Sequence, residues 1–258
     1  ALAKTVFDAL GALVRCIGVS PDGTNINAEC GSTRPERLCE LVRLHSLDLG
    51  FAFDGDADRC ICVDERGEVV DGDGILWVCA KDMHERSELG GGGVVTTVVS
   101  NGGLARALER SGILCTRTQV GDKYVAEEMA RRGALLGGEP SGHIVFRKYA
   151  TTGDGILTAL RVAEIVLERK CPLSFLTRGY VPLPQKKRDV PVPGGAAILE
   201  REDVRAAIAR AQGEDVRMVV RASGTEPVVR ILAEGDEAAA EGALRLVERA
   251  VRAAAEEL

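Results

Sequence analysis

The sequence predicts an α/β protein made of two layered domains followed by a small α+β domain. Up to about residue 170, strand and helix patterns alternate, as they do in βαβ units with a largely parallel sheet. Residues 172–193 then contain five of the nine prolines, which favours a linker because proline blocks helices and central strands. The remaining patterns are typical of a small α+β unit. We therefore expect domains at residues 1–71, 72–180 and 181–258.

The first domain is expected to begin inside a helix, because no N-cap residue precedes its apolar pattern and the chain has no initiator Met. Pro35 suits the first position of a second helix, and an apolar strand follows that helix. The sequence therefore indicates that the chain is a fragment of a longer protein. The expected elements are a helix at 2–10, a strand at 13–19, a helix at 35–46 and strands at 49–53 and 60–64.

Apolar runs and turn residues also predict the elements of the second and third domains. The second domain is expected to hold helices at 75–84, 104–109, 123–132 and 154–169, with strands at 94–99 and 113–120. The third is expected to hold a helix at 202–212, strands at 216–220 and 228–234, and an Ala-rich helix to the end.

Composition excludes several classes of function. The net charge of −6 argues against a nucleic-acid surface, which normally carries a basic patch. No run of about 18 apolar residues is present, so we expect no membrane span. The eight cysteines include no C-x-x-C pair, so a zinc site is not indicated. We expect reduced cysteines and a cytoplasmic protein, with Cys60 and Cys62 as buried apolar residues on one strand face.

The chain is organised around the carboxylate loop, residues 54–59 (DGDADR), which directly follows an apolar strand. Asp54, Asp56 and Asp58 stand at alternate positions, and three like charges this close repel unless a cation neutralises them. Carboxylate oxygens suit a hard divalent ion such as Mg²⁺. The alternative is a solvated Asp-Gly turn. The repeated carboxylates followed by Arg59 favour a metal site.

Two further loops carry polar groups between glycines. The Glu139 loop, residues 138–143 (GEPSGH), places Glu139, Ser141 and His143 within five residues, where Glu139 could accept hydrogen bonds from a sugar. A surface turn and a structural histidine are the alternatives there. Residues 121–124 could also place Lys123 at the start of a helix facing a cleft, with a solvated charge as the alternative.

The Ser223 loop, residues 221–230 (RASGTEPVVR), is the third candidate. Ser223, Gly224 and Thr225 offer hydroxyls and backbone N–H groups between Arg221 and Arg230. Such a nest accepts a phosphate, and arginine adds bidentate charge-assisted hydrogen bonds. An ordinary hairpin turn is the alternative. In an acidic protein, this loop predicts a local phosphate site.

The order of these three loops resembles the α-D-phosphohexomutase superfamily over essentially the whole chain. The resemblance is strongest to its phosphoglucosamine mutase branch, on residues 22–27 (DGTNIN), 30–32 (CGS), 121–123 (GDK) and 151–156 (TTGDGI). It implies an enzyme of four domains with one active-site loop per domain. The second domain of that enzyme would supply the carboxylate loop, the third the Glu139 loop and the fourth the Ser223 loop. The expected fold is thus two α/β/α phosphohexomutase-type domains, the first truncated, and a small α+β domain.

The resemblance also implies a role for each matching residue. Asp54, Asp56 and Asp58 would hold Mg²⁺, and Arg59 would face the transferred phosphoryl group, with Lys123 as a second catalytic residue. Glu139, Ser141 and His143 would bind the sugar. The substrate's other phosphate would be bound by residues of the Ser223 loop: Arg221, Ser223, Gly224, Thr225 and Arg230.

The implied activity is that of an isomerase that interconverts glucosamine 6-phosphate and glucosamine 1-phosphate. The reaction would pass through a bisphosphate and an enzyme phosphoserine and would supply cell-wall amino-sugar synthesis. The family's phosphoserine lies in a Ser-His-Asn-type loop, and these 258 residues contain no such loop. We therefore expect them to bind metal and phosphosugar without catalysing turnover by themselves. A homodimer of the full-length enzyme is a further expectation.

Departures from the branch pattern leave alternatives open. Pro140 stands where the branch usually has Gln, and Ala222 where it usually has Pro. A phosphomannomutase or phosphoglucomutase of the same superfamily is one alternative. A Mg²⁺-dependent, haloacid-dehalogenase-like phosphatase is a second, although Asp58 replaces the usual Thr or Val. An EF-hand calcium site with Asp54 at its first position and Glu65 at its twelfth is the third, although Arg59 occupies its glycine position.

Overall fold

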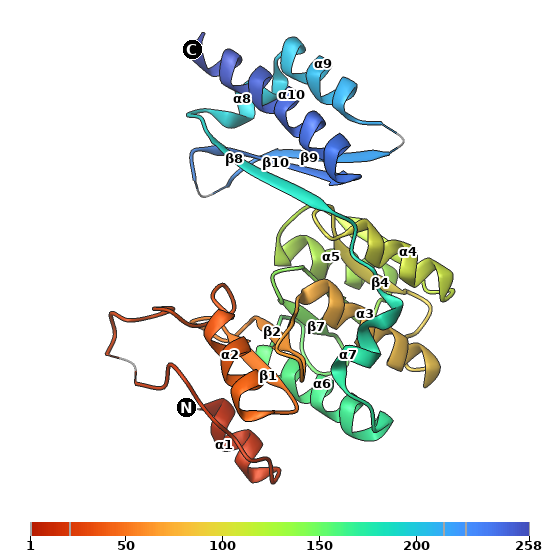
Figure 1. The fold of residues 1–258 in the computed structure, drawn as a ribbon. Helices are drawn as coiled ribbons and strands as arrows, with labels where there is room; N and C mark the ends of the chain where they lie inside the picture. Colours follow the sequence, from red (N-terminus) through yellow and green to blue (C-terminus); the bar gives the residue numbers. More distant parts are fainter. Residues whose placement is uncertain (1, 21, 214, 225, 258) are drawn as a thin grey trace. The chain divides into compact units, whose positions relative to one another are not determined.

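The computed structural model describes residues 2–20, 22–213, 215–224 and 226–257. The chain divides into two compact units (Figure 1). Unit 1 comprises residues 1–100 and 104–181, and unit 2 comprises residues 101–103 and 182–258.

The first part of unit 1 is a small antiparallel sheet. It follows helices α1 (Leu2–Ala9) and α2 (Glu36–His45), and its strands are β1 (Gly50–Phe53), β2 (Cys60–Val63) and β3 (Val69–Val70), in the order β1-β2-β3. Cys39 and Val42 of α2 pack on Val63, and Phe7 of α1 stacks on Phe51 with ring centroids 5.4 Å apart.

Two expectations for this part are wrong. The largely parallel sheet does not form here, because β1 and β2 are joined by only residues 54–59, and a parallel crossover needs about a dozen residues or more. Residues 13–19 form no strand. Their apolar run lies outside the sheet, and Leu13 is 99% exposed.

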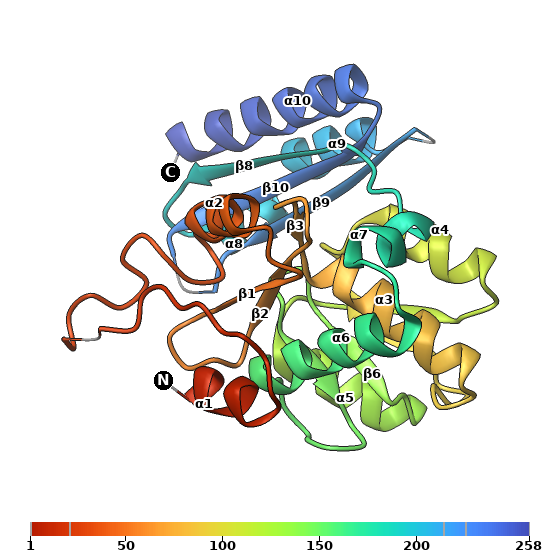
Figure 2. The same ribbon diagram turned by 60° about the horizontal axis from the view of Figure 1, so that its bottom comes forward.

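The second part of unit 1 has α/β/α layers, seen from two sides in Figures 1 and 2. Strands β5, β4 and β6 are parallel and β7 is antiparallel, in the order β5-β4-β6-β7. Residues of α5 cover one face at Val95 and Val145, and the main core lies on the other face. The elements are α3 (Gly72–Glu85), β4 (Val94–Thr97), α4 (Gly102–Arg110), β5 (Cys115–Thr118), α5 (Asp122–Arg132), β6 (Leu136–Gly138), β7 (Ile144–Phe146), α6 (Gly155–Arg169), α7 (Leu173–Leu176) and the 3₁₀ turn η1 (Thr177–Gly179).

Unit 2 is an antiparallel sheet with helices packed on one face (Figure 1). The strand order is β8-β10-β9. Alternate residues of β10 point to the helices, so Val229, Ile231 and Ala233 are buried in that core. The elements are β8 (Gln185–Pro191), α8 (Gly195–Glu200), α9 (Glu202–Ala211), β9 (Val216–Ala222), β10 (Val228–Gly235) and α10 (Glu237–Glu256).

The expectation of a linker over residues 172–193 is wrong for β8. The one proline of β8, Pro191, is compatible with a strand because β8 lies at the edge of its sheet and Pro191 is its last residue. Other expectations are confirmed: all eight cysteines are free, and Cys60 and Cys62 are fully buried. Among the described residues, no helix combines the length and the apolar character needed to cross a membrane.

Candidate active site

The carboxylate loop connects the neighbouring strands β1 and β2, and this short connection gathers its three aspartates. One oxygen of each of Asp54, Asp56 and Asp58 lies within 4.8 Å of the others. The loop turns at Ala57, whose φ of 60° is left-handed. The backbone N–H of Arg59 donates to Asp54 Oδ1 at 3.2 Å. The three carboxylates therefore lie together at one end of the β1–β2 pair.

The electrostatics of this cluster suit a bound cation. Burial and then the neighbouring Asp54 raise the pKa of Asp58. Among the described residues, Asp58 Oδ1 is buried without a hydrogen-bond partner. Arg59 Nε lies 3.4 Å from Asp54 and 3.8 Å from Asp58, so it offsets part of the charge. An all-oxygen donor set with an unsatisfied buried oxygen fits a hard divalent ion such as Mg²⁺.

Backbone pairing joins the Glu139 loop to the carboxylate loop. Arg59 and His143 form an isolated antiparallel bridge, and the Cys60 N–H donates to the Gly142 carbonyl at 3.0 Å. Gly142 has φ 92°, and a Cβ there would lie 2.3 Å from the Cys60 carbonyl oxygen. Only glycine allows this approach. The two motifs are thus one structural site within unit 1.

His143 lies inside this joint, with a side chain only 4% exposed. Its Nε2 is 3.6 Å from Asp58 Oδ2 and accepts the Gly153 N–H at 3.2 Å. Gly153 was not singled out as a site residue from the sequence. In the structure, a Cβ at Gly153 would lie 2.5 Å from the His143 ring, so the position requires glycine. The signal in the sequence was the pair of glycines in residues 153–155 (GDG).

Glu139 connects this site to the loop before α5. Its Oε1 accepts the Gly121 N–H at 2.8 Å, and its Oε2 lies 3.4 Å from the Ser141 hydroxyl. The departure at Pro140 is compatible with this arrangement, because Pro140 contributes only its carbonyl, which accepts the Gly72 N–H at 3.0 Å. Lys123 makes an ion pair outside this group of residues: its side chain is 74% exposed, and its Nζ lies 3.8 Å from Glu127.

The Ser223 loop belongs to unit 2 and joins β9 to β10. Arg221 and Arg230 are directly opposite partners on these strands, so their side chains leave the same face of the sheet. The Ser223 N–H donates to the Val228 carbonyl at 2.9 Å. A Cβ at Gly224 would meet no atom within 4 Å. Thr225 lies outside the described residues.

Two carboxylates hold Arg230, and neither was assigned a role from the sequence. Glu226 of the same loop forms an ion pair with its guanidinium, and Asp189 of β8 lies 3.8 Å from Arg230 Nε. Asp189 is the β8 partner of Arg230. Because residues 172–193 were expected to be a linker, Asp189 could not be placed beside this loop from the sequence.

Comparison with known families covers nearly the whole chain. Three models of phosphoglucomutase/phosphomannomutase match in order: alpha/beta/alpha domain II at residues 2–67, alpha/beta/alpha domain III at 71–182 and the C-terminal domain at 180–251. Phosphoglucosamine mutase from Lachnospira eligens is 54% identical over 90% of this chain and 52% of its own length. That from Symbiobacterium thermophilum is 51% identical over 92% and 54%. The chain thus spans about half the length of these curated relatives.

Solved structures share the fold. A phosphoglucomutase/phosphomannomutase family protein from Burkholderia thailandensis matches with a TM-score of 0.80 and 25% identity, over 98% of this chain and 57% of that one. Aspergillus fumigatus N-acetylphosphoglucosamine mutase, solved in complex with GlcNAc-6P and magnesium, matches with a TM-score of 0.74 and 24% identity over 89% and 54%.

Proposed function

Because the chain belongs to the phosphohexomutase family and matches its domains II, III and IV in order, we propose that it forms the metal-, sugar- and phosphate-binding parts of a phosphoglucosamine mutase. The observation that carries this proposal is the joint between the carboxylate loop and the Glu139 loop, made by the Arg59–His143 bridge. The sequence similarity to phosphoglucosamine mutases over about nine-tenths of the chain supports the choice of branch. We infer a cytoplasmic enzyme, which eight free cysteines support.

In this proposal the carboxylate loop holds Mg²⁺ through Asp54, Asp56 and Asp58. When bound, the ion neutralises charge on a phosphoryl group. Arg59 stays half exposed, with 43% of its side chain accessible, so its guanidinium remains available to a phosphate while its Nε faces Asp54. The work of this part is positioning and electrostatic stabilisation, which dominate phosphoryl transfer.

The Glu139 loop would bind sugar hydroxyls. Glu139 Oε1 accepts a hydrogen bond from the Gly121 N–H, which holds the side chain in one position. Glu139 Oε2 and the Ser141 hydroxyl then form a neighbouring pair of polar groups. A fixed acceptor beside a hydroxyl suits a polyol, because each hydroxyl needs both an acceptor and a donor. We assign His143 to this site through its contact with Asp58. Lys123 would have to leave Glu127 to reach a substrate.

The Ser223 loop would bind the phosphate that does not react. Arg221 and Arg230 bracket it from opposite strands, and its backbone N–H groups supply further donors. Glu226 and Asp189 hold the guanidinium of Arg230 in place before a phosphate arrives.

Two other functions remain testable candidates. A phosphomannomutase or phosphoglucomutase would use the same groups on a sugar without the amino substituent, and a Mg²⁺-dependent phosphatase would use one aspartate as a nucleophile. An EF-hand is contradicted, because strands β1 and β2 flank the carboxylate loop and Glu65 accepts a hydrogen bond from the Ser174 N–H at 3.3 Å.

Calorimetric titration in Mg²⁺ buffer tests the proposal. We expect glucosamine 6-phosphate to bind at least tenfold more tightly than mannose 6-phosphate or glucose 6-phosphate. Glu139→Gln should weaken this binding at least tenfold, because the amide replaces one of the two acceptor oxygens with an NH2 donor. The control Glu128→Gln changes a carboxylate that pairs only with Arg131 and Arg132 among the described residues. Preference for mannose or glucose phosphate, or hydrolysis of a generic phosphomonoester, would contradict the proposal.

A further inference from the structure

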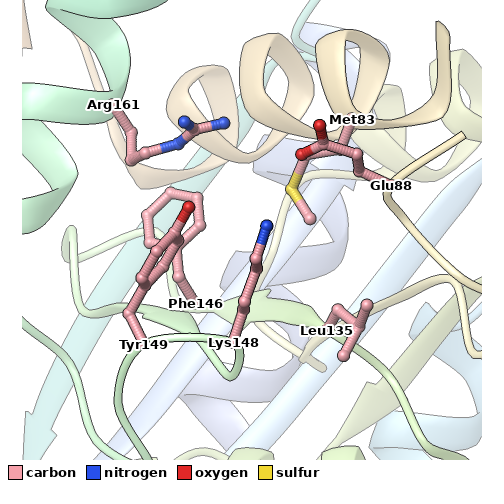
Figure 3. Close-up of a pocket in the computed structure, with 7 residues that line it drawn as sticks. All are labelled: Met83, Glu88, Leu135, Phe146, Lys148, Tyr149 and Arg161. Carbon is pink, nitrogen blue, oxygen red and sulfur yellow. The ribbon is translucent and has the colours of Figure 1, made fainter. Parts of the chain in front are cut away.

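A cavity of about 230 Å³ lies in unit 1, apart from the carboxylate loop (Figure 3). Its apolar wall is made by Met83 of α3, by Leu135 and by Phe146 of β7. Met83 and Phe146 are almost fully buried, at 6% and 2% exposure. Tyr149, which is 54% exposed, adds an aromatic ring to the lining.

Two cations reach into this cavity from opposite walls. Figure 3 shows the guanidinium of Arg161 and the Nζ of Lys148 pointing into the space between them. Arg161 is only 14% exposed in its side chain, and its ion pair is with Glu164. Among the described residues its Nε is buried without a hydrogen-bond partner. This nitrogen is a donor that the protein itself leaves unused.

Lys148 is the second cation of the lining, and it is exposed. Its Nζ lies 5.7 Å from the centroid of the Tyr149 ring, and no ion pair to a carboxylate is found for it within the described part of the chain. Among the described residues that line the cavity, Glu88 is the one carboxylate beside the two cations Lys148 and Arg161, and Arg161 also pairs with Glu164. An apolar wall facing two cations is complementary to an amphipathic anion.

We propose that this cavity binds a small aromatic carboxylate. An aromatic ring would pack on Phe146 and Met83, and the carboxylate would accept charge-assisted hydrogen bonds from Arg161 and Lys148. The volume of about 230 Å³ is below the roughly 300–1,000 Å³ of pockets for drug-sized ligands. It therefore selects a single-ring compound and excludes a nucleotide.

The cavity is separate from the proposed active site but shares a strand pair with it. In β6 and β7, Leu136 pairs with Phe146 at the cavity end, and Gly138 pairs with Ile144 at the end that leads into the Glu139 loop. Leu136 and Gly138 are two steps apart along β6, which corresponds to about 7 Å of strand. The binding proposed for the cavity requires no metal and no phosphosugar, so its test does not depend on the proposed mutase function.

Ligand-observed NMR titration of the full chain with phenylacetate tests the proposal. We expect saturable binding and at least tenfold weaker binding of phenylacetamide, which has the same ring without the charge. This comparison of two ligands needs no variant. Equal binding of the two compounds, or no saturation below about 10 mM, would overturn the proposal.

Variants locate the site. Lys148→Gln changes an exposed residue, so the fold should be retained. Arg161→Met keeps an apolar side chain in place of the arginine stem. Each variant should weaken phenylacetate binding at least fivefold. Lys81→Gln is the matched control, because Lys81 Nζ also lies 5.7 Å from an aromatic centroid, that of Trp77, but does not line the cavity. Unchanged binding by Lys148→Gln, or an equal loss in Lys81→Gln, would contradict the assignment.

Discussion

Arg59 and His143 pair through an isolated antiparallel bridge, which joins the end of the carboxylate loop to the end of the Glu139 loop. The His143 imidazole lies beneath this joint, 3.6 Å from Asp58. Two glycines make the packing possible, Gly142 against the Cys60 carbonyl and Gly153 against the imidazole ring. The position of the proposed metal-binding residues therefore depends on a loop that is distant in sequence.

Gly153→Ala should disturb this joint. The added Cβ would lie 2.5 Å from the His143 ring, so either the imidazole or the loop must move. Overpacking of this kind costs about 1–3 kcal/mol, and thermal unfolding should show a lower Tm. Gly91→Ala is the matched control, because a Cβ there meets no atom within 4 Å. Equal melting temperatures for the two variants would show that the joint tolerates the change.

Arg230→Met should weaken phosphate binding by unit 2. The arginine is held by Glu226 and Asp189, and hydrogen bonds to charged groups contribute about 1.5–3 kcal/mol. Glucosamine 6-phosphate should therefore bind at least tenfold more weakly in calorimetry. Arg249→Met, on the exposed side of α10, should bind normally. A normal affinity for Arg230→Met would remove this residue from the proposed phosphate site.

The stability of unit 2 should fall in acid because of Glu234. Burial raises the pKa of this carboxyl, but the hydrogen bonds from Arg217, Gly102 and Gln185 together lower it below its ordinary value. A carboxyl whose pKa is lower in the folded state stabilises the fold. This stabilisation is complete at pH values above the pKa of the unfolded chain, about 4.5, and is lost as the pH falls through the pKa of the folded state.

Glu234→Gln should remove this dependence. Hydrogen exchange of the β10 amides, measured from pH 7 to pH 3, should show lower protection in the variant at pH 7 and a smaller loss of protection on acidification. Glu237→Gln, whose wild-type side chain is 74% exposed, should follow the wild type. A wild-type acid response in Glu234→Gln would assign the effect to other groups.

The sequence indicated the candidate loops, but not the residues that hold their side chains in place. Asp54, Asp56 and Asp58 could be recognised because their spacing lies in one short loop. The contact of Gly153 with His143 and the pairing of Asp189 with Arg230 were not recognised. The GDG motif marks Gly153 as unusual but does not name its neighbour, and Asp189 lay in a segment expected to be a linker.

The errors in the fold have a similar origin. Residues 13–19 have an apolar composition but no strand beside them, and local composition does not report the presence of a partner. For β8, the prolines obscured a strand that needs hydrogen bonds on only one side. The direction of β2 relative to β1 was decided by the length of the carboxylate loop, which a count of its residues could have indicated.

The central claim is that the carboxylate loop binds a divalent metal. Mn²⁺ titration followed by electron paramagnetic resonance measures this directly, with Mn²⁺ as the probe for Mg²⁺. We predict one saturable site per chain, weakened at least tenfold in Asp58→Asn and unchanged in Asp215→Asn, where the wild-type aspartate is exposed in unit 2. The same saturable binding in Asp58→Asn as in the wild type would contradict the claim.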